Sequence, residues 1–365
     1  MDILFTSPPR CEIFSIPSDE FCRRQANFLG CNKRAGKDNT LIARADIIVT
    51  DALLLWLSQS PGTLIVSASG EPLLGCIQTG KLDELQSGFD GNISNALTVL
   101  KAGEHSFFAR KLRRREPITV NDLRITPVRK IEKTLFDSSF KGVTDFVTKY
   151  IWPVPTWFTV RAFVKLKISP NAVTIFGIGL CVLACVLFHQ GQIGAALITG
   201  WIMTFLDTVD GKLARVTATS SNIGNILDHS TDVIHPPIWW ACLGMGLVTL
   251  SSETHQTYIF IATAIIVGGY IVGRFIESGF KMKFGFNPFL WQPFDSKFRL
   301  FISRRNVNLL ILTLGFLSGH LLYSFYLIAL WKAVSTIIQF MRLLLADRQS
   351  KAGQEISIFL ATAQN

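Results

Sequence analysis

Six apolar blocks in the second half of the chain, uncharged except for Lys332, restrict its fold more than any other feature. They cover residues 173–188, 191–206, 233–250, 257–273, 307–322 and 323–341. Several blocks are shorter than the roughly 20 residues that a perpendicular membrane helix needs, so each would have to include flanking residues. The blocks therefore suit either six transmembrane helices or the buried helices of a large soluble core.

The basic residues between the blocks distinguish these two interpretations. Lys and Arg are absent from the segments that follow the first, third and fifth blocks. They occur in the other connecting segments and after the last block, as Lys212, Arg215, Arg274, Lys281, Lys283, Lys297, Arg299, Arg304, Arg305, Arg342, Arg348 and Lys351. Membrane proteins keep positive charge in their cytoplasmic loops, whereas a soluble core gives no reason for such an alternation. The pattern predicts an α-helical, multi-pass protein of the inner, or cytoplasmic, membrane, with both termini on the cytoplasmic side.

The residues before about 170 have the mixed polarity of a soluble α/β domain. A helix is expected over 18–29, where Ser18 would be the N-cap. Strands are expected over 3–6, 12–16, 47–50, 63–68 and 73–78, and the last two would form a hairpin. The predicted organisation is a cytosolic α/β domain over 1–137, an interfacial juxtamembrane segment over 138–170, a six-helix transmembrane domain over 171–345 and a cytosolic tail over 346–365.

The net charge indicates what kind of partner the chain binds, and the cysteine spacing indicates whether disulfides or zinc sites are expected. Lys and Arg number 36 against 26 Asp and Glu, and the net charge of +10 favours an anionic partner. Basic residues gather before the first block, over 110–115 and, beside aromatic residues, over 149–167. We expect them to contact anionic membrane lipids and not nucleic acid, with a solvated linker as the alternative for 110–115. The seven Cys have neither disulfide nor zinc-site spacing, and the N-terminus shows no cleavable secretory signal.

The second apolar block ends in a cluster of acidic and small residues. Asp207 and Asp210 are three residues apart, and Asp228 and Asp232 are four apart on the next expected helix. At these spacings each pair shares one face of its helix. Two antiparallel helices joined by a short cytoplasmic loop would bring the faces together, so that four carboxylates converge at the membrane boundary.

Four converging carboxylates need a positive counter-charge. They would repel one another and would be costly near lipid. Divalent cations remove this conflict, and a site made of oxygens favours Mg²⁺, Mn²⁺ or Ca²⁺ over zinc. Two such cations about 3.5–4 Å apart are a known arrangement for displacement at phosphorus. Gly211, Ala214 and Gly224 lack bulk, which would let a diphosphate approach, and Arg215 could pair with a phosphate or with a carboxylate.

The four aspartates together with Gly211, Ala214, Arg215 and Gly224 form the pattern D-x2-D-G-x2-A-R-x8-G-x3-D-x3-D. In this pattern the chain resembles the CDP-alcohol phosphatidyltransferase family. Pro170-Asn171-Ala-Val-Thr174, just before and at the start of the first block, is also similar to a motif of that family. The resemblance covers about residues 138–345. It implies a six-helix fold and transfer of a phosphoryl-bearing group from a CDP-linked donor to an alcohol acceptor, with release of CMP.

The resemblance also implies roles for individual residues. Asp207, Asp210 and Asp228 would bind two Mg²⁺ or Mn²⁺ ions, and Asp232 would be both the general base and a further metal ligand. The CDP site would be lined by Asn171, Thr174, Gly211, Ala214, Arg215 and Gly224. A homodimer is a further expectation for the family.

The acceptor alcohol is less well determined. Arg274, Lys281, Arg304 and Arg305 favour an acceptor that carries its own phosphate, such as inositol phosphate or glycerol phosphate, with CDP-diacylglycerol as the donor. Setting the membrane topology is the alternative role of these cations. Asp228-His229 resembles instead the choline/ethanolamine phosphotransferase branch, in which a CDP-aminoalcohol donates to diacylglycerol. There His229 would assist proton transfer or cap the helix start.

Two other interpretations concern the rest of the chain. Some members of the family carry a nucleotidyltransferase-like domain, which the first 137 residues loosely resemble. No GxGxR loop occurs before residue 140, so we expect an inactive domain. A non-enzymatic scaffold or a cation transporter is disfavoured, because a transporter would place ionisable groups near the middle of its spans. Lys332 is the one Lys or Arg inside an apolar block, and it is either functional or snorkels to the membrane surface.

Overall fold

The computed structural model describes residues 3–5, 12–29, 39–44, 46–78, 81–90, 94–110, 112–219 and 222–362. The chain divides into two compact units. The first comprises Met1–Gly142, Thr159–Ile168 and Lys212–Ser220, and the second comprises Val143–Phe158, Ser169–Gly211 and Ser221–Asn365. Each unit is described by itself.

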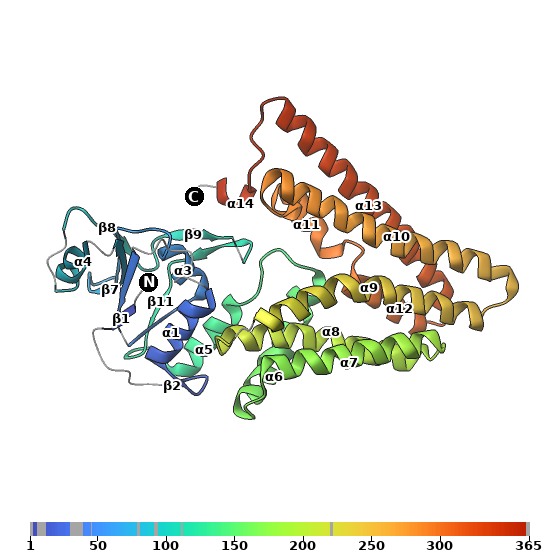
Figure 1. Ribbon diagram of the computed structural model, residues 1–365, viewed down its shortest axis with the longest axis horizontal. Helices are drawn as coiled ribbons and strands as arrows, with labels where there is room; N and C mark the ends of the chain where they lie inside the picture. The colour runs from blue at the N-terminus through green and yellow to red at the C-terminus, as the bar shows by residue number, and fades with distance from the viewer. Residues whose placement is uncertain are drawn as a thin grey trace. The chain divides into compact units, whose positions relative to one another are not determined.

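A mixed five-stranded sheet organises the first unit (Figure 1). Its strands, in spatial order, are β1 (Ile3–Phe5), β4 (Asn39–Ala43), β7 (Pro72–Gln78), β6 (Thr63–Val66) and β8 (Thr98–Lys101). β7 is antiparallel to both neighbours, and the two outer pairs are parallel. The smaller pairs are β2 (Glu12–Ile13) with β3 (Ile16–Pro17), β5 (Ile47–Val49) with β11 (Val120–Asp122), and β9 (Ser106–Ala109) with β10 (Arg114–Pro117). The helices are α1 (Ser18–Leu29), α3 (Asp51–Leu57), α4 (Leu82–Phe89) and α5 (Val128–Ser138).

Most elements expected in this unit are confirmed. The helix over Ser18–Leu29 has the predicted bounds. β6 and β7 form the predicted hairpin, and Gly70 lies in its turn with a φ of +90°, a value that glycine adopts without steric cost. The single strand expected over 12–16 is wrong, because the backbone turns at Phe14 and Ser15, with φ of 48° and 59°. Two short paired strands result.

Long apolar helices make up the second unit. Within the described part of the chain, five helices are long and apolar enough to span a membrane: α7 (Pro170–His189), α8 (Ile193–Val216), the Val233–Leu250 part of α9 (Asn222–Leu250), α10 (Glu253–Phe284) and α13 (Leu321–Lys351). α11 (Pro293–Phe301) and α12 (Arg305–Leu317) meet at a bend of 42° and pass the same test as a pair. The predicted membrane helices are thus confirmed, and they number six if the bent pair is one span. The remaining elements are η2 (Val147–Ile151), α6 (Pro153–Lys165), η3 (Pro288–Leu290) and α14 (Phe359–Thr362).

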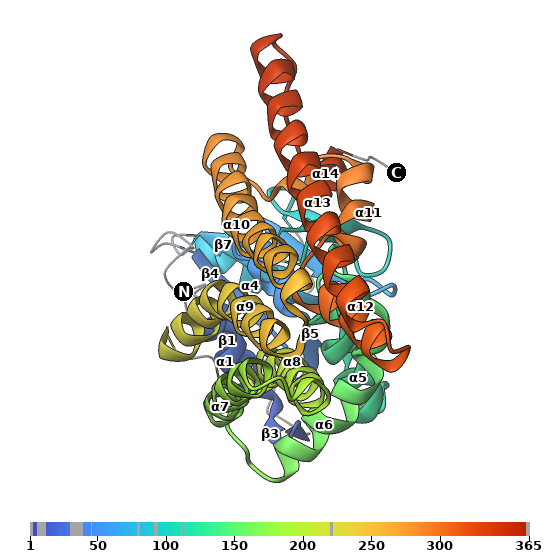
Figure 2. The ribbon, with the colours of Figure 1, turned by 90° about the vertical axis from the view of Figure 1, so that its right-hand side faces the viewer.

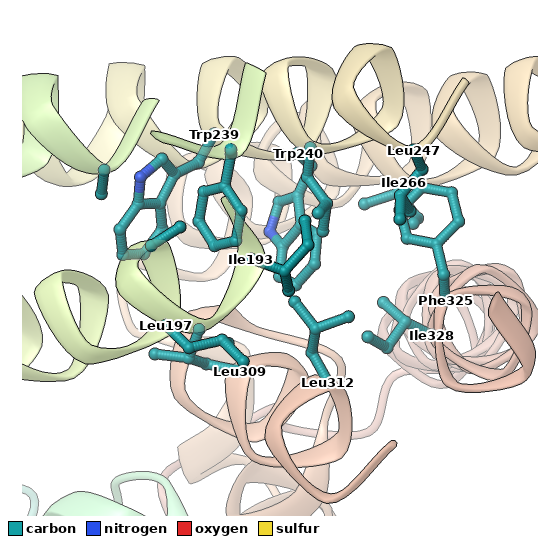
Figure 3. Close-up of a cluster of buried hydrophobic side chains, with 14 of the residues drawn as sticks. Ile193, Leu197, Trp239, Trp240, Leu247, Ile266, Leu309, Leu312, Phe325 and Ile328 are labelled. Carbon is teal, nitrogen blue, oxygen red and sulfur yellow. The ribbon is translucent and has the colours of Figure 1, made fainter. Parts of the chain in front are cut away.

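Close packing joins these helices around one apolar core. α9 contacts α7 and α10, and α13 contacts α10 and α12 (Figures 1 and 2). Figure 3 shows the core between them, where Trp239 and Trp240 of α9 face Leu309 and Leu312 of α12. A Cβ at Gly246 would lie only 1.9 Å from the Phe188 carbonyl oxygen, so α9 can approach α7 this closely only with glycine there.

The break between α11 and α12 is held by side chains of α13. The Ser303 N–H donates to Ser335 Oγ at 3.1 Å, and the Ser303 carbonyl accepts from Lys332 Nζ at 3.1 Å. The Ser303 hydroxyl donates to Asn308 Oδ1 at 2.9 Å. These bonds satisfy backbone groups that the break between the two helices leaves without helical partners. Lys332 is 5 % exposed, so it points into the bundle and does not snorkel.

Candidate active site

Asp207 and Asp210 lie on one face of α8, as their spacing predicts. Asp210 is buried, and its Oδ2 accepts a hydrogen bond from Thr174 Oγ1 of α7 at 2.7 Å. Ser169 caps the start of α7 by accepting from the Ala172 N–H, which fixes the turn that carries Thr174. The structure therefore brings together the two motifs that the sequence placed at 170–174 and 207–215. Asn171 is exposed on the same turn.

An arginine 98 residues further along the chain contacts Asp207. Arg305 Nη2, at the start of α12, donates to Asp207 Oδ2 at 2.6 Å. Arg305 Nη1 lies 3.3 Å from His235 Nε2, and His235 Nδ1 lies 2.6 Å from the Thr231 carbonyl oxygen. His235 is buried and packs edge-on against Trp239, with ring centres 5.7 Å apart. Arg305, expected from the sequence to contact the acceptor, lies beside an acid of the signature.

The second acidic pair lies on α9, close to its first residue. The backbone at Gly224, Asp228, His229 and Asp232 is helical, but their side chains are outside the described residues. Among the side chains that the structure describes, no three His, Cys, Asp or Glu residues form a group that could hold a metal ion. The convergence of all four carboxylates thus remains a prediction.

The two described carboxylates suit a hard divalent cation. Mg²⁺ and Mn²⁺ prefer carboxylate oxygens, and Asp207 and Asp210 offer these from one helix face. A Cβ at Gly211 would meet no other described atom within 4 Å, so no described side chain packs against α8 directly after Asp210.

The remaining signature residues on α8 belong to the first unit. Arg215 Nη1 and Lys212 Nζ both donate to the Ser139 carbonyl, the latter at 2.7 Å. Lys212 Nζ also lies 3.8 Å from the centre of the Phe140 ring. Ser139 directly follows α5, whose C-terminal carbonyls carry partial negative charge and favour cations. Ala214 is half-buried next to them.

A second polar cluster lies among α10, α12 and α13. Glu277 Oε1 accepts from Arg304 Nη2 and, at 2.8 Å, from Gln339 Nε2, and Glu277 Oε2 lies 3.6 Å from Arg274 Nη1. Lys332 Nζ is 5.1 Å from the centre of the Tyr270 ring, in the same small cleft. Three basic side chains thus surround one carboxylate, which leaves an excess of positive charge inside the bundle. Lys281 is exposed one turn beyond Glu277.

The start of α12 is fixed by a buried aspartate. Asp145 accepts from the Thr148 N–H at 3.0 Å, from the Thr148 hydroxyl at 2.9 Å and from Asn306 Nδ2 at 3.0 Å. Burial raises the pKa of Asp145, but the positive charge of Arg299 and these hydrogen bonds outweigh burial and hold the pKa below its ordinary value. Asn306 follows Arg304 and Arg305, so Asp145 positions the turn that carries both arginines.

Two residues of these clusters were not expected from the sequence. Glu277 is an ionisable residue within a membrane helix, three residues after Arg274, and that position alone marks it as a functional candidate. His235 lies three residues after Asp232 and immediately before Pro236 and Pro237. Nothing in its spacing pointed to Arg305, which is 70 residues further along the chain.

The helices and the site define a class: a multi-pass membrane protein with carboxylates at the end of one of its spans. Residues 167–295 match the family model described as CDP-alcohol phosphatidyltransferase. This segment contains all eight positions of the family's signature, over residues 207–232.

The similar proteins include a phosphatidylinositol phosphate synthase of Mycobacteroides abscessus, 28% identical over 127 residues, which are 33% of this chain and 56% of that protein. The chain thus spans little more than half the length of this curated relative. The solved structures include the phosphatidylinositol phosphate synthase of Mycobacterium tuberculosis with CDP-DAG bound, at a TM-score of 0.41 and 20% identity, covering 52% of this chain and 92% of that one. The same protein in complex with manganese and citrate gives a TM-score of 0.42 and 20% identity, over 52% of this chain and 88% of that one.

Proposed function

We propose that this protein is a divalent-cation-dependent transferase of phospholipid synthesis. It moves the phosphatidyl group of CDP-diacylglycerol to the hydroxyl of a phosphorylated polyol, such as inositol phosphate or glycerol phosphate, and releases CMP. The observation that carries this proposal is the contact of Thr174 with the buried Asp210, beside Asp207, within the segment that matches the family. Thr174 belongs to the family motif at 170–174 and Asp210 to the one that begins at Asp207, so residues of two separate motifs are in contact.

The residues divide the work of the reaction. Asp207, Asp210 and Asp228 would hold the Mg²⁺ or Mn²⁺ ions, which would neutralise phosphate charge and stabilise the CMP leaving oxygen. Asp232 accepts the proton of the acceptor hydroxyl, whose pKa lies far above 7. Thr174 keeps Asp210 in position, and Gly211, which has no side chain, lets the diphosphate approach, with Asn171, Ala214, Arg215 and Gly224 completing the CDP site.

The positive cluster favours a phosphorylated acceptor. Arg274, Arg304 and Lys332 carry more positive charge than Glu277 balances, so an anionic group is stabilised near them. A choline or ethanolamine head group is itself cationic and would be repelled there. The name of the relative from M. abscessus, a phosphatidylinositol phosphate synthase, agrees with an acceptor of this kind.

The proposal extends to the setting of the enzyme. The active site and both termini face the cytoplasm, the lipid tails of the donor enter from the bilayer, and the protein works as a homodimer. The α/β domain over 1–137 is inactive, since it lacks a GxGxR loop for a nucleoside triphosphate.

Membranes that contain the protein, incubated with CDP-diacylglycerol and a panel of labelled alcohols, test the function. We expect CMP release that requires Mg²⁺ or Mn²⁺, responds to phosphorylated polyols and is lost in Asp210→Asn and Asp232→Asn. Asp83→Asn, on the exposed side of α4, is the control and should retain activity. Turnover by the two active-site variants at the wild-type rate would refute the site. Activity only with CDP-choline or CDP-ethanolamine and diacylglycerol would reverse the assignment of the lipid substrate.

A further inference from the structure

Arg305 bridges an acid of the signature and a buried histidine. Arg305 Nη2 donates to Asp207 Oδ2 at 2.6 Å, and Arg305 Nη1 lies 3.3 Å from His235 Nε2. The side chains of Arg305 and Asp207 are 15% and 21% exposed, so water screens their attraction only in part.

The hydrogen bonds of His235 determine its form. The Thr231 carbonyl oxygen, 2.6 Å from Nδ1, can only accept, so Nδ1 carries a proton. The Arg305 guanidinium can only donate, so Nε2 is unprotonated and accepts from it. These two contacts assign the Nδ1–H tautomer to His235, and its ring contacts Thr231 on one side and Trp239 on the other. A fixed acceptor at this point aims the second arm of Arg305 at Asp207.

We infer that Arg305 is the internal counter-cation of Asp207 while no divalent cation is bound, and that His235 is the positioning residue that holds it there. This inference rests on the proposed role of Asp207 as a metal ligand. A cation that binds to Asp207 Oδ2 displaces the guanidinium, since both need that carboxylate oxygen. Arg305 thus lowers the affinity for the metal and keeps the acidic helix end neutralised in its absence.

The competition between Arg305 and the metal for Asp207 predicts the direction in which the metal affinity changes when Arg305 is replaced. Loss of the positive charge at position 305 removes both the competing ligand and its repulsion of the metal. We expect Arg305→Gln to bind Mn²⁺ about tenfold more tightly than the wild type, which corresponds to about 1.4 kcal/mol. His235→Leu removes the acceptor and should tighten binding by a smaller factor, whereas His235→Gln places an amide acceptor near the Nε2 position and should restore the wild-type affinity.

Binding of Mn²⁺ alone, followed by the electron paramagnetic resonance signal of free Mn²⁺, tests this on the full chain in detergent micelles. Arg348→Gln is the matched control, because it removes the same charge from an exposed residue near the end of α13. Tighter binding in Arg305→Gln, with Arg348→Gln unchanged, supports the inference. Unchanged or weaker binding in Arg305→Gln overturns it, and so does equal tightening by Arg348→Gln.

The same titration separates this inference from the proposed function. Asp210→Asn should abolish the binding that the wild type shows. If it does so and Arg305→Gln leaves the affinity unchanged, the metal site stands and the counter-cation role fails. If the wild type binds no Mn²⁺, both proposals fail together.

Discussion

Replacement of Thr174 by valine tests whether the start of α7 positions the acid on α8. Valine has nearly the shape of threonine, so the change removes a hydroxyl without leaving a cavity. That hydroxyl has one proton and two acceptors, the Pro170 carbonyl at 3.1 Å and Asp210 Oδ2 at 2.7 Å. The shorter bond to the charged acceptor is the stronger one. A hydrogen bond to a charged group contributes about 1.5–3 kcal/mol.

This free energy sets the expected loss of activity. Since 1.4 kcal/mol is a factor of ten, kcat/KM for CDP-diacylglycerol should fall about 10- to 100-fold in Thr174→Val. The assay is CMP release by purified protein at saturating Mn²⁺. Thr174→Ser keeps the hydroxyl and should stay within a few-fold of the wild type.

Thr199→Val is the matched control, because the Thr199 hydroxyl donates only to a backbone carbonyl of its own helix, that of Ala195. We expect it to retain full activity. Thr174→Val with wild-type kcat/KM, in a protein whose Asp210→Asn variant is inactive, would refute the positioning role of Thr174.

Two further predictions concern stability. Glu277→Gln leaves Arg274, Arg304 and Lys332 without the carboxylate that they surround, and should lower the free energy of unfolding by about 3–5 kcal/mol. The measurement is the melting temperature in detergent, and Glu253→Gln, at an exposed site on the same helix, is the control that should leave it unchanged. Equal melting temperatures for Glu277→Gln and the wild type would contradict the stabilising role of the cluster. Because the pKa of Asp145 is lowered in the folded protein, its carboxylate stabilises the fold above the ordinary value of 3.8, and this contribution is lost as pH falls through the lowered pKa. The difference in melting temperature between wild type and Asp145→Asn should therefore be constant near neutral pH and shrink in acid, and a difference that grows in acid would contradict the assignment.

The membrane helices could be predicted from the sequence because apolar composition and loop charge are local properties. The lengths of these helices could not be predicted in the same way. α8 continues ten residues beyond its apolar block to Val216, and α9 begins at Asn222, eleven residues before its block. Apolar composition marks the part of a helix that lipid covers, whereas the polar ends that carry the acids continue the same helix outside that part.

From the sequence, the site could be predicted only for residues that are close together on one helix or that belong to a known motif. Asp207 and Asp210 share a face because helix geometry fixes three-residue neighbours, and the family motif pointed to Thr174. The partners of these residues come from tertiary packing. Arg305 is 98 residues from Asp207, and Ser139 is 76 residues from Arg215. No periodicity connects such pairs, so Arg305 was expected to contact the acceptor, and Arg215 a phosphate or a carboxylate.

The bend between α11 and α12 has a consequence for the bilayer around the protein. The 13 residues of α12 rise about 20 Å, so the pair crosses a hydrocarbon thickness of about 30 Å only with the contribution of α11, which continues at an angle of 42°. The Ser303 contacts with Lys332 and Ser335 fix that angle, so the helix cannot straighten to match a thicker membrane. Hydrophobic mismatch must then be absorbed by thinning of the lipid at this edge. Turnover should therefore depend on the acyl-chain length of the host membrane, and be greatest where the chains are short.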